Sequence, residues 1–415
     1  MNKEFDYLRE LGKQLAEIAA LPVQEEKKKL WTANNDLKPV RPMVYIDQLP
    51  WHEIKRSKEM EQRCEDTFLR SVEEYILKLL YRWKHFPCDM VVENRVDIPK
   101  TPRKAGTDIY DLDYGMNIVE ETAKTDEEND VYSHKYEDQI ATPEQLAELK
   151  PALIKVDPEV DKRRLEICEE IFNGIIPVRL EGIQIHAGLW DRIAQMRSVE
   201  KILWDIIDDP EFIIQTVKKF VELTMSTIDQ CEALGLLDHQ LQYVHCTGAY
   251  TGDLPQKDYA GGKARAKDCW AFGMAQLFAT VSPAMHEEFE IDLVKPVYER
   301  FGLLYYGCCE PLEKKIGIIR KIKNVRKISI SPWANIDESA DNMGKDYVLS
   351  LKSNPAFIAS AVNEKEIRGQ IEKAVQACKR NGSPLEIILK DVSTVSSKLE
   401  SLDHWNRIAM EYALA

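Results

Sequence analysis

The sequence lacks several features that would define its class at once. None of its apolar stretches reaches the roughly 18 residues that a membrane-spanning helix needs. It has no basic excess either, because 56 Lys and Arg against 70 Asp and Glu give a formal net charge of -14. This charge argues against a nucleic acid as partner. The N-terminus has the pattern of an acidic amphipathic helix rather than a secretory signal, so we expect a cytoplasmic protein that does not insert into a membrane.

Three motifs of familiar chemistries are also missing. There is no glycine-rich dinucleotide turn, no Gly-x-Ser-x-Gly nucleophile motif and no Cys-x-x-Cys pair. The nine cysteines are an odd number spread over the whole chain, which argues against a disulfide framework and for reduced thiols. A cysteine cluster would then be a metal or catalytic candidate.

What the sequence does contain, from about residue 160 onwards, is a regular alternation of helical and strand-like segments. Such alternation predicts parallel βαβ units. We predict an α/β fold, a (β/α)8 TIM barrel over residues 86–415, with an insertion at 100–150 and a loop over the barrel mouth at 250–272. Residues 1–85 are predicted as an N-terminal helical extension packed on the barrel, with one short strand-like run at 43–47.

In such a barrel the active site lies at the carboxyl ends of the strands. The expected strand 241–246 ends at His245 and Cys246, and the next one, in "LLYYGCCEPL", ends at Cys308, Cys309 and Glu310. The last strand ends at Lys390 and Asp391. Thiolate and imidazole are preferred ligands of zinc, so the set His245, Cys246, Cys308 and Cys309 predicts a zinc site, in which we expect two or three true ligands. The alternative for each residue alone is simple packing, because free cysteines are mostly buried.

Other residues at the predicted mouth are candidates for substrate contact. His186 ends the strand before "HAGLWDR", which also contains Trp190, and Trp333 follows the strand at 326–331. We predict these three side chains as substrate-binding residues. For Trp190 a plain core contact at the start of a helix is the competing interpretation.

The chain resembles the uroporphyrinogen decarboxylase superfamily over roughly residues 165–410. The resemblance is carried by "RIAQMRSVEKILWDIIDDPEFIIQTV", by "LFATVSPAMHEEFEIDLVKP" with the cysteine-bearing strand after it, and by "ISISPWANIDESADNMGKDYVLSLKSNP". It implies one of two chemistries: decarboxylation of uroporphyrinogen III, or zinc-dependent methyl transfer to or from a corrinoid.

The residues favour the second chemistry. The decarboxylases of the superfamily have an arginine-bearing motif near the N-terminus, and "RPMVYIDQLPW" stands there without it. The methyltransferases have His-x-Cys at the end of the strand that is "LLYYGCC" here. Tyr306 stands in the place of that His if Cys308 takes the place of the family Cys, and Gly307 does if Cys309 takes it. The resemblance therefore implies a variant zinc site in which His245 replaces the family imidazole. We predict Tyr306 and Glu310 as catalytic residues beside it.

The predicted function is thus a zinc-dependent methyltransferase that moves a methyl group between a small heteroatom-methyl substrate and a corrinoid (cobalamin), which a partner protein carries. Two alternatives stay open. One is a decarboxylase, for which the candidate carboxylate-binding arginines are Arg95, Arg103, Arg179, Arg192 and Arg265. The other is a non-catalytic protein that binds a corrinoid or a partner. A homo-oligomer is compatible with either.

Overall fold

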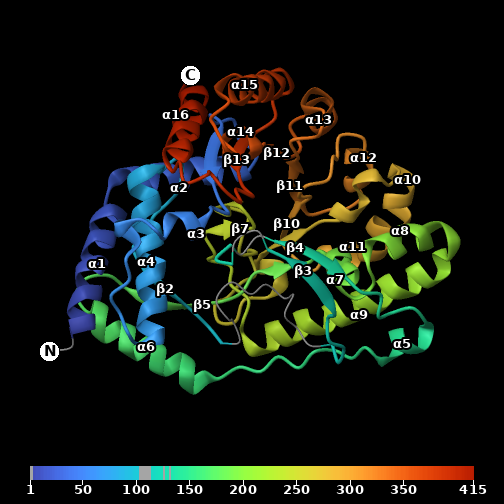
Figure 1. Cartoon of the computed structure of the whole chain (residues 1–415), viewed down its shortest axis with the longest axis horizontal. Coiled ribbons are helices and arrows are strands. Elements are labelled where there is room, and N and C mark those ends of the chain that lie inside the picture. Colours follow the sequence, from blue (N-terminus) through green and yellow to red (C-terminus); the bar gives the residue numbers. More distant parts are fainter. Residues whose placement is uncertain (1–2, 102–113, 125–126, 130–131) are drawn as a thin grey trace.

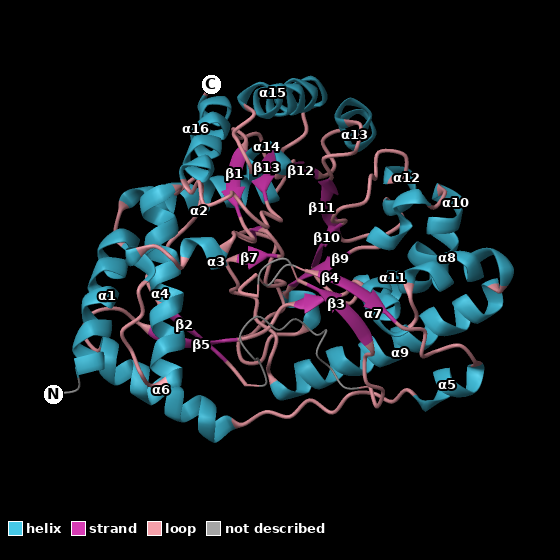
Figure 2. Ribbon diagram, in the orientation of Figure 1, coloured by secondary structure: helices cyan, strands magenta, loops and turns pink. Residues whose placement is uncertain are grey.

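The computed structural model describes residues 3–101, 114–124, 127–129 and 132–415. Figure 1 shows most strands inside the molecule, with α16, α15, α13, α10, α8, α5, α6 and α1 along its outline. Figure 2 shows the same arrangement by type of secondary structure, with helices outside and strands within. No helix among the described residues is long and apolar enough to cross a membrane.

Seven strands form one parallel sheet in the order β1-β13-β12-β11-β10-β9-β6. Most of their side chains are buried on both faces, as expected for a parallel sheet covered by helices. The strands are β1 (Met43–Ile46), β6 (Ile185–His186), β9 (Trp270–Gly273), β10 (Leu303–Tyr306), β11 (Val325–Ile330), β12 (Val348–Ser353) and β13 (Leu385–Leu389).

The helices connect these strands and cover them. They are α1 (Lys3–Ala19), α2 (Pro22–Asn35), α3 (Trp51–Ile54), α4 (Thr67–His85), α5 (Pro143–Glu148), α6 (Pro158–Phe172), α7 (Leu189–Met196), α8 (Val199–Asp208), α9 (Pro210–Leu234), α10 (Pro283–His286), α11 (Asp292–Tyr298), α12 (Ile316–Ile319), α13 (Ile336–Met343), α14 (Ala356–Ala359), α15 (Glu364–Asn381) and α16 (Glu400–Leu414). A π-helical turn over 287–291 joins α10 to α11.

Six further strands lie in three separate pairs. They are β2 (Val96–Pro99) with β5 (Val178–Glu181), β3 (Glu120–Ala123) with β4 (Ser133–Tyr136), and β7 (Tyr243–Val244) with β8 (Thr247–Gly248). The fold is therefore α/β with a parallel sheet, as predicted. Among the described residues, backbone pairing does not join the two edges β1 and β6, so the closed barrel stays a prediction.

The predicted helical extension also supplies a sheet strand. β1 pairs in parallel with β13, from Met43 opposite Glu386 to Ile46 opposite Leu389. The helices α1 and α4 of this segment pack on each other, and α1 also packs on α6. Part of the predicted 100–150 insertion, including Arg103, lies outside the described residues, and the described part contains the β3–β4 hairpin and α5.

One predicted strand and one predicted loop boundary are wrong. The segment 241–246 is no barrel strand but one arm and the turn of the antiparallel β7–β8 hairpin, with His245 at a φ of 53°. The predicted mouth loop 250–272 is too long at its C-terminal end, because residues 270–272 belong to β9, which pairs in parallel with both β6 and β10. The cause of the second error is length: β9 spans only four residues, too few for hydrophobic periodicity to separate them from a loop.

A buried ion pair crosses the inside of the sheet. Lys327 on β11 and Glu386 on β13 lie 2.7 Å apart (Nζ to Oε2), and both side chains are 0% exposed. The same ammonium donates to Thr247 Oγ1 and to the carbonyl of Gly248, and so connects the β7–β8 hairpin to the sheet. Because each charge is far from water, each depends on the other for its stabilisation.

Replacement of one partner should destabilise the fold strongly. We expect Lys327→Met to lower the free energy of unfolding by about 3–5 kcal/mol, since it leaves the carboxylate of Glu386 buried without its cation. The matched control is Lys373→Met, which removes an ammonium from an exposed ion pair with Asp337 and should change little. Urea denaturation of both variants measures the difference, and equal effects would contradict this account.

Candidate active site at the end of β10

The chain turns sharply where β10 ends, and this turn presents the two adjacent cysteines. Gly307 has a φ of 92°, and a Cβ atom there would lie 2.4 Å from Leu312 Cδ1, so a glycine is required. Glu310, which is 0% exposed, accepts hydrogen bonds from the backbone N–H of Cys308 (2.9 Å) and of Ala275 (3.2 Å). This carboxylate therefore ties the turn after β10 to the end of β9.

Five side chains meet in front of this turn, and we call them the thiol cluster: His245, Cys308, Cys309, Lys390 and Asp391. Cys308 Sγ lies 3.5 Å from Cys309 Sγ, 3.9 Å from His245 Nε2 and 3.3 Å from Lys390 Nζ. Cys309 Sγ lies 3.9 Å from Asp391 Oδ2, and Lys390 Nζ lies 2.8 Å from the same oxygen. Of the nine cysteines, all of them described, Cys309 is the one that is exposed.

The imidazole of His245 enters the cluster from the β7–β8 hairpin. It stacks on Phe272 of β9, with ring centroids 3.8 Å apart and the planes 7° from parallel. Its backbone N–H donates to Gln184 Oε1 at 3.0 Å, which holds the hairpin turn. Thus the sequence prediction that His245 lies beside Cys308 has a different structural basis: a hairpin turn instead of a strand end.

The contacts in the cluster make the exposed thiol the more acidic of the two. The hydrogen bond from Cys308 lowers the pKa of the Cys309 thiol, and Lys390 acts in the same direction against the effect of burial. The same bond and burial raise the pKa of Cys308 well above its usual range. Burial lowers the pKa of Lys390, but the sulfurs of Cys308 and Cys246 and the Asp391 carboxylate outweigh it and raise the pKa overall. Lys390 therefore stays an ammonium, and Cys309 is the more readily ionised of the two adjacent thiols.

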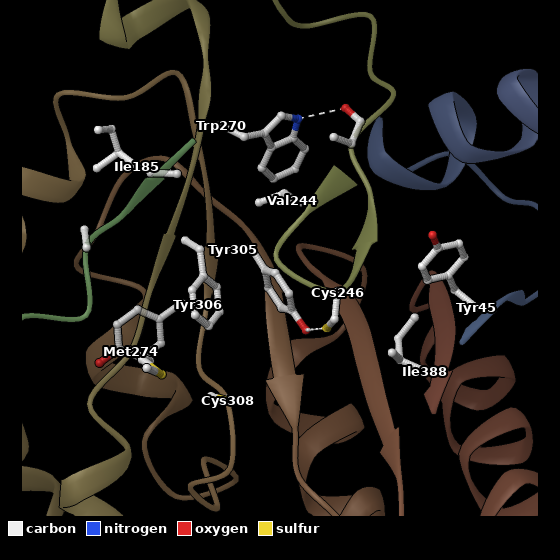
Figure 3. Close-up of a cluster of buried hydrophobic side chains, with 14 of the residues drawn as sticks. Tyr45, Ile185, Val244, Cys246, Trp270, Met274, Tyr305, Tyr306, Cys308 and Ile388 are labelled. Atoms are coloured by element: carbon white, nitrogen blue, oxygen red, sulfur yellow. Dashed lines mark hydrogen bonds between the residues drawn. The ribbon is translucent and has the colours of Figure 1, made fainter. Parts of the chain in front are cut away.

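Two of the predicted residues lie apart from the cluster. Cys246 is buried and accepts from Lys352 Nζ at 3.0 Å, and its Sγ lies 3.8 Å from the hydroxyl of Tyr305. Tyr306 points to the other side of β10, where its hydroxyl bonds His286 Nε2 of α10 at 2.8 Å. Figure 3 shows the rings of Tyr305 and Tyr306 on opposite sides of the strand. Tyr306 thus holds a helix against the sheet.

Of the three predicted substrate-binding residues, one lies near the cluster and two lie elsewhere. Trp190 is 0% exposed and packs on Phe278, with ring centroids 4.5 Å apart, so it is a core residue. Trp333 is 70% exposed in the loop after β11. His186 lies near the cluster, its ring edge-on to His245 at 6.2 Å between centroids. Burial, then the charge of His245, lowers the pKa of His186 well below its usual range, so it is neutral at pH 7.

A cavity of about 370 Å³ adjoins the cluster. His186 and His245 form one side of it, and the side chains of β2, β5 and α4 form much of the rest. His245 lines this cavity, and its Nε2 lies 3.9 Å from Cys308 Sγ. The ring of His245 therefore lies between the cavity and the sulfur of Cys308.

The predicted zinc ion suits the chemistry of these residues but not their placement. Imidazole and thiolate are zinc ligands, and two donors on one tetrahedral ion lie about 3.7 Å apart, close to the pair distances in the cluster. Yet no three His, Cys, Asp or Glu side chains in the described part of the chain are placed so that they could hold a metal ion together. The ammonium of Lys390 also lies beside the sulfur of Cys308, where it would repel a cation.

Sequence reasoning missed one aromatic residue of this site and one buried carboxyl group that interacts with Glu310. Phe272, the support of His245, lay in the segment predicted as a loop. Asp191, at the start of α7, has its pKa raised to about 7 by burial and by the charge of Glu310, with Gln276 opposing. Lys390 and Asp391 were predicted as strand-end residues, but their contacts with the two thiols have no sequence signal.

Comparisons with known proteins show the fold alone. No family model matches the chain, and no curated protein matches its sequence. Among solved structures, a methyltransferase from Methanosarcina mazei is similar, with a TM-score of 0.50 and 10% sequence identity. The similarity covers 93% of this chain and 98% of that chain, so the two share their overall architecture. Membership of the uroporphyrinogen decarboxylase superfamily stays a prediction.

Cys309 should be the most reactive thiol at neutral pH. We expect iodoacetamide to modify Cys309 first, with a rate whose pH midpoint lies below that of an ordinary thiol, because a lowered pKa means more thiolate at pH 7. In Cys308→Ala, which removes the hydrogen-bond donor, this midpoint should rise and the rate at pH 7 fall. Peptide mass spectrometry after timed alkylation measures both.

The matched control for this experiment is Cys378→Ala, which removes a buried thiol far from the cluster along the chain. It should leave the alkylation of Cys309 unchanged. An unchanged pH midpoint in Cys308→Ala would show that the two sulfurs do not share a proton.

Proposed function

We propose that this protein is a methyltransferase that moves a methyl group between a small heteroatom-methyl substrate and a corrinoid carried by a partner protein. The observation that carries the proposal is an exposed thiol of lowered pKa at the carboxyl end of a parallel sheet, in a cluster whose His245 lines a cavity. The name of the similar methyltransferase structure supports the reaction class. The corrinoid rests on the family resemblance.

In this proposal Cys309 is the nucleophile and the rest of the cluster prepares it. Its thiolate attacks the methyl carbon, a carbon–sulfur bond forms, and the bond from carbon to the heteroatom breaks with its electron pair left on the heteroatom. Lys390 and the Cys308 thiol stabilise the thiolate before the attack. A corrinoid supplies, at its cobalt, the site that exchanges the methyl group with this protein.

The decarboxylase alternative receives less support. It needs arginines at the mouth, and the described candidates are engaged elsewhere. Arg179 bonds Asp97 and Asp238, and Arg265 bonds Asp258 and Asp268. Arg95 also bonds Asp97, and Arg192 bonds Gln195 and lies over the ring of Tyr114. Neither Glu310 nor Tyr306 enters the proposed step, because one holds backbone N–H groups and the other faces a helix.

The activity test uses cob(I)alamin as acceptor and a panel of methylated amines, alcohols and thioethers as donors. We expect one donor class to yield methylcobalamin, seen by its absorbance, and Cys309→Ser to lower the rate by about 100-fold or more. Cys378→Ser is the matched control and should retain the wild-type rate. Full activity in Cys309→Ser would overturn the proposed role of the thiolate. Corrinoid binding without transfer from any donor would favour the non-catalytic alternative.

Zinc is included in this proposal only for a thiol cluster in which the side chain of Lys390 has moved. His245, Cys308 and Cys309 would be its ligands once Lys390 had moved from Cys308, and no step above depends on the ion. We therefore expect Lys390→Met to bind zinc at least about tenfold more tightly than the wild type, because a repelling charge is gone. Competition with a chromogenic chelator measures this. Equal zinc affinity in Lys390→Met and in the double variant Cys308→Ser, Cys309→Ser would exclude these ligands.

A further inference from the structure

We propose that the cavity of about 370 Å³ beside His186 and His245 binds a small methylated cation, an ammonium or a sulfonium, in preference to a neutral or anionic molecule of the same shape. That this cation is the methyl donor rests on the proposed function. As a statement about binding, it rests on the wall of the cavity alone.

The charged side chains in this wall are of one sign. Asp97 of β2 and Glu181 of β5 line the cavity, and no lysine or arginine is among the described residues that do. Arg95 and Arg179 bond Asp97, and Arg179 Nη2 also lies 4.0 Å from Glu181 Oε1, but neither arginine lines the space. A cation that enters therefore meets carboxylates directly, while an anion would lose its water with no positive side chain in the wall.

Two aromatic rings complete this wall. Tyr75 of α4 and Tyr243 of β7 both line the cavity, and Tyr243 packs on Tyr45 with ring centroids 5.0 Å apart. The electron-rich face of a tyrosine ring attracts a cation, and rings combined with carboxylates are a known way to bind methylated ammonium groups. Burial, then the charges of Asp97 and Glu181, raises the pKa of Tyr75 well above its usual range, so its hydroxyl stays neutral.

The position of the cavity connects this binding to the chemistry. His245 lines it and also lies 3.9 Å from Cys308 Sγ, so a bound molecule would be one ring away from the thiol cluster. Methyl transfer from a bound cation to the Cys309 thiolate requires the His245 ring to turn aside, because the attacking sulfur must reach about 3–3.5 Å from the methyl carbon. The transfer then forms a carbon–sulfur bond and breaks a carbon–nitrogen bond, whose electron pair stays on nitrogen. The positive and negative charges cancel, and a neutral amine and a neutral thioether remain.

Three probes of the same shape test the inference: trimethylammonium, tert-butanol and pivalate. Calorimetric titration of the full chain should show trimethylammonium bound at least about tenfold more tightly than tert-butanol, with no binding of pivalate. Glu181→Gln should weaken the cation about tenfold and leave tert-butanol unchanged. Tyr75→Leu should weaken the cation, whereas the matched Tyr75→Phe, which keeps the ring, should not. Circular dichroism confirms that each variant is folded.

Equal binding of the cation and tert-butanol, or tighter binding of pivalate, would overturn the inference. The two proposals fail separately. If the cavity shows no preference for the cation but the protein still transfers methyl groups from a neutral donor, this inference is wrong and the proposed function stands. If the cavity binds the cation but Cys309→Ser keeps full transfer activity, the proposed function is wrong and this inference about binding stands.

Discussion

The site depends on one buried carboxylate. Glu310 is fully inaccessible to water and accepts hydrogen bonds from the backbone of two neighbouring segments, at Cys308 after β10 and at Ala275 after β9. A buried carboxylate without such donors would be costly, so the two strand ends and the carboxylate stabilise one another. The positive φ of Gly307 lets the chain turn back far enough to make these bonds. The direction of the Cys308 and Cys309 side chains follows from this anchored turn.

Buried lysines place a positive charge at three positions along the sheet. Three buried lysines lie on β11, on β12 and just after β13, and each has a different partner. Lys327 has a carboxylate, Lys352 has the sulfur of Cys246 with the Tyr305 hydroxyl, and Lys390 has Cys308 with Asp391. The first is a structural pair, remote from solvent at both ends. Only the third lies beside an exposed thiol, so an ammonium that elsewhere holds the fold together here lowers the pKa of the Cys309 thiol.

The strand-end rule explains which parts of the site could be predicted. The strands β10 and β13 are continuous apolar runs, and the residues after them, Cys308, Cys309, Lys390 and Asp391, do lie together because parallel strands end at one edge. The rule failed for His245 and Cys246, since their strand is a short hairpin whose turn sends the two side chains to different partners. It also failed for Tyr306, because neighbouring residues of a strand face opposite sides and its ring went to the helical side.

The sequence by itself determined the α/β class, the parallel order of βα units in the C-terminal half and the identity of the residues at the strand ends. These follow from local patterns: apolar runs, helix periodicity and turns. The tertiary structure decided everything that depends on contacts between distant segments. It placed β1 in the sheet and stacked Phe272 on His245. It also brought Lys390 beside Cys308 and formed the hydrogen bond between Tyr306 and His286. The lowered pKa of Cys309 is set by such contacts, because a thiol responds to the charges and donors that folding brings within a few ångströms.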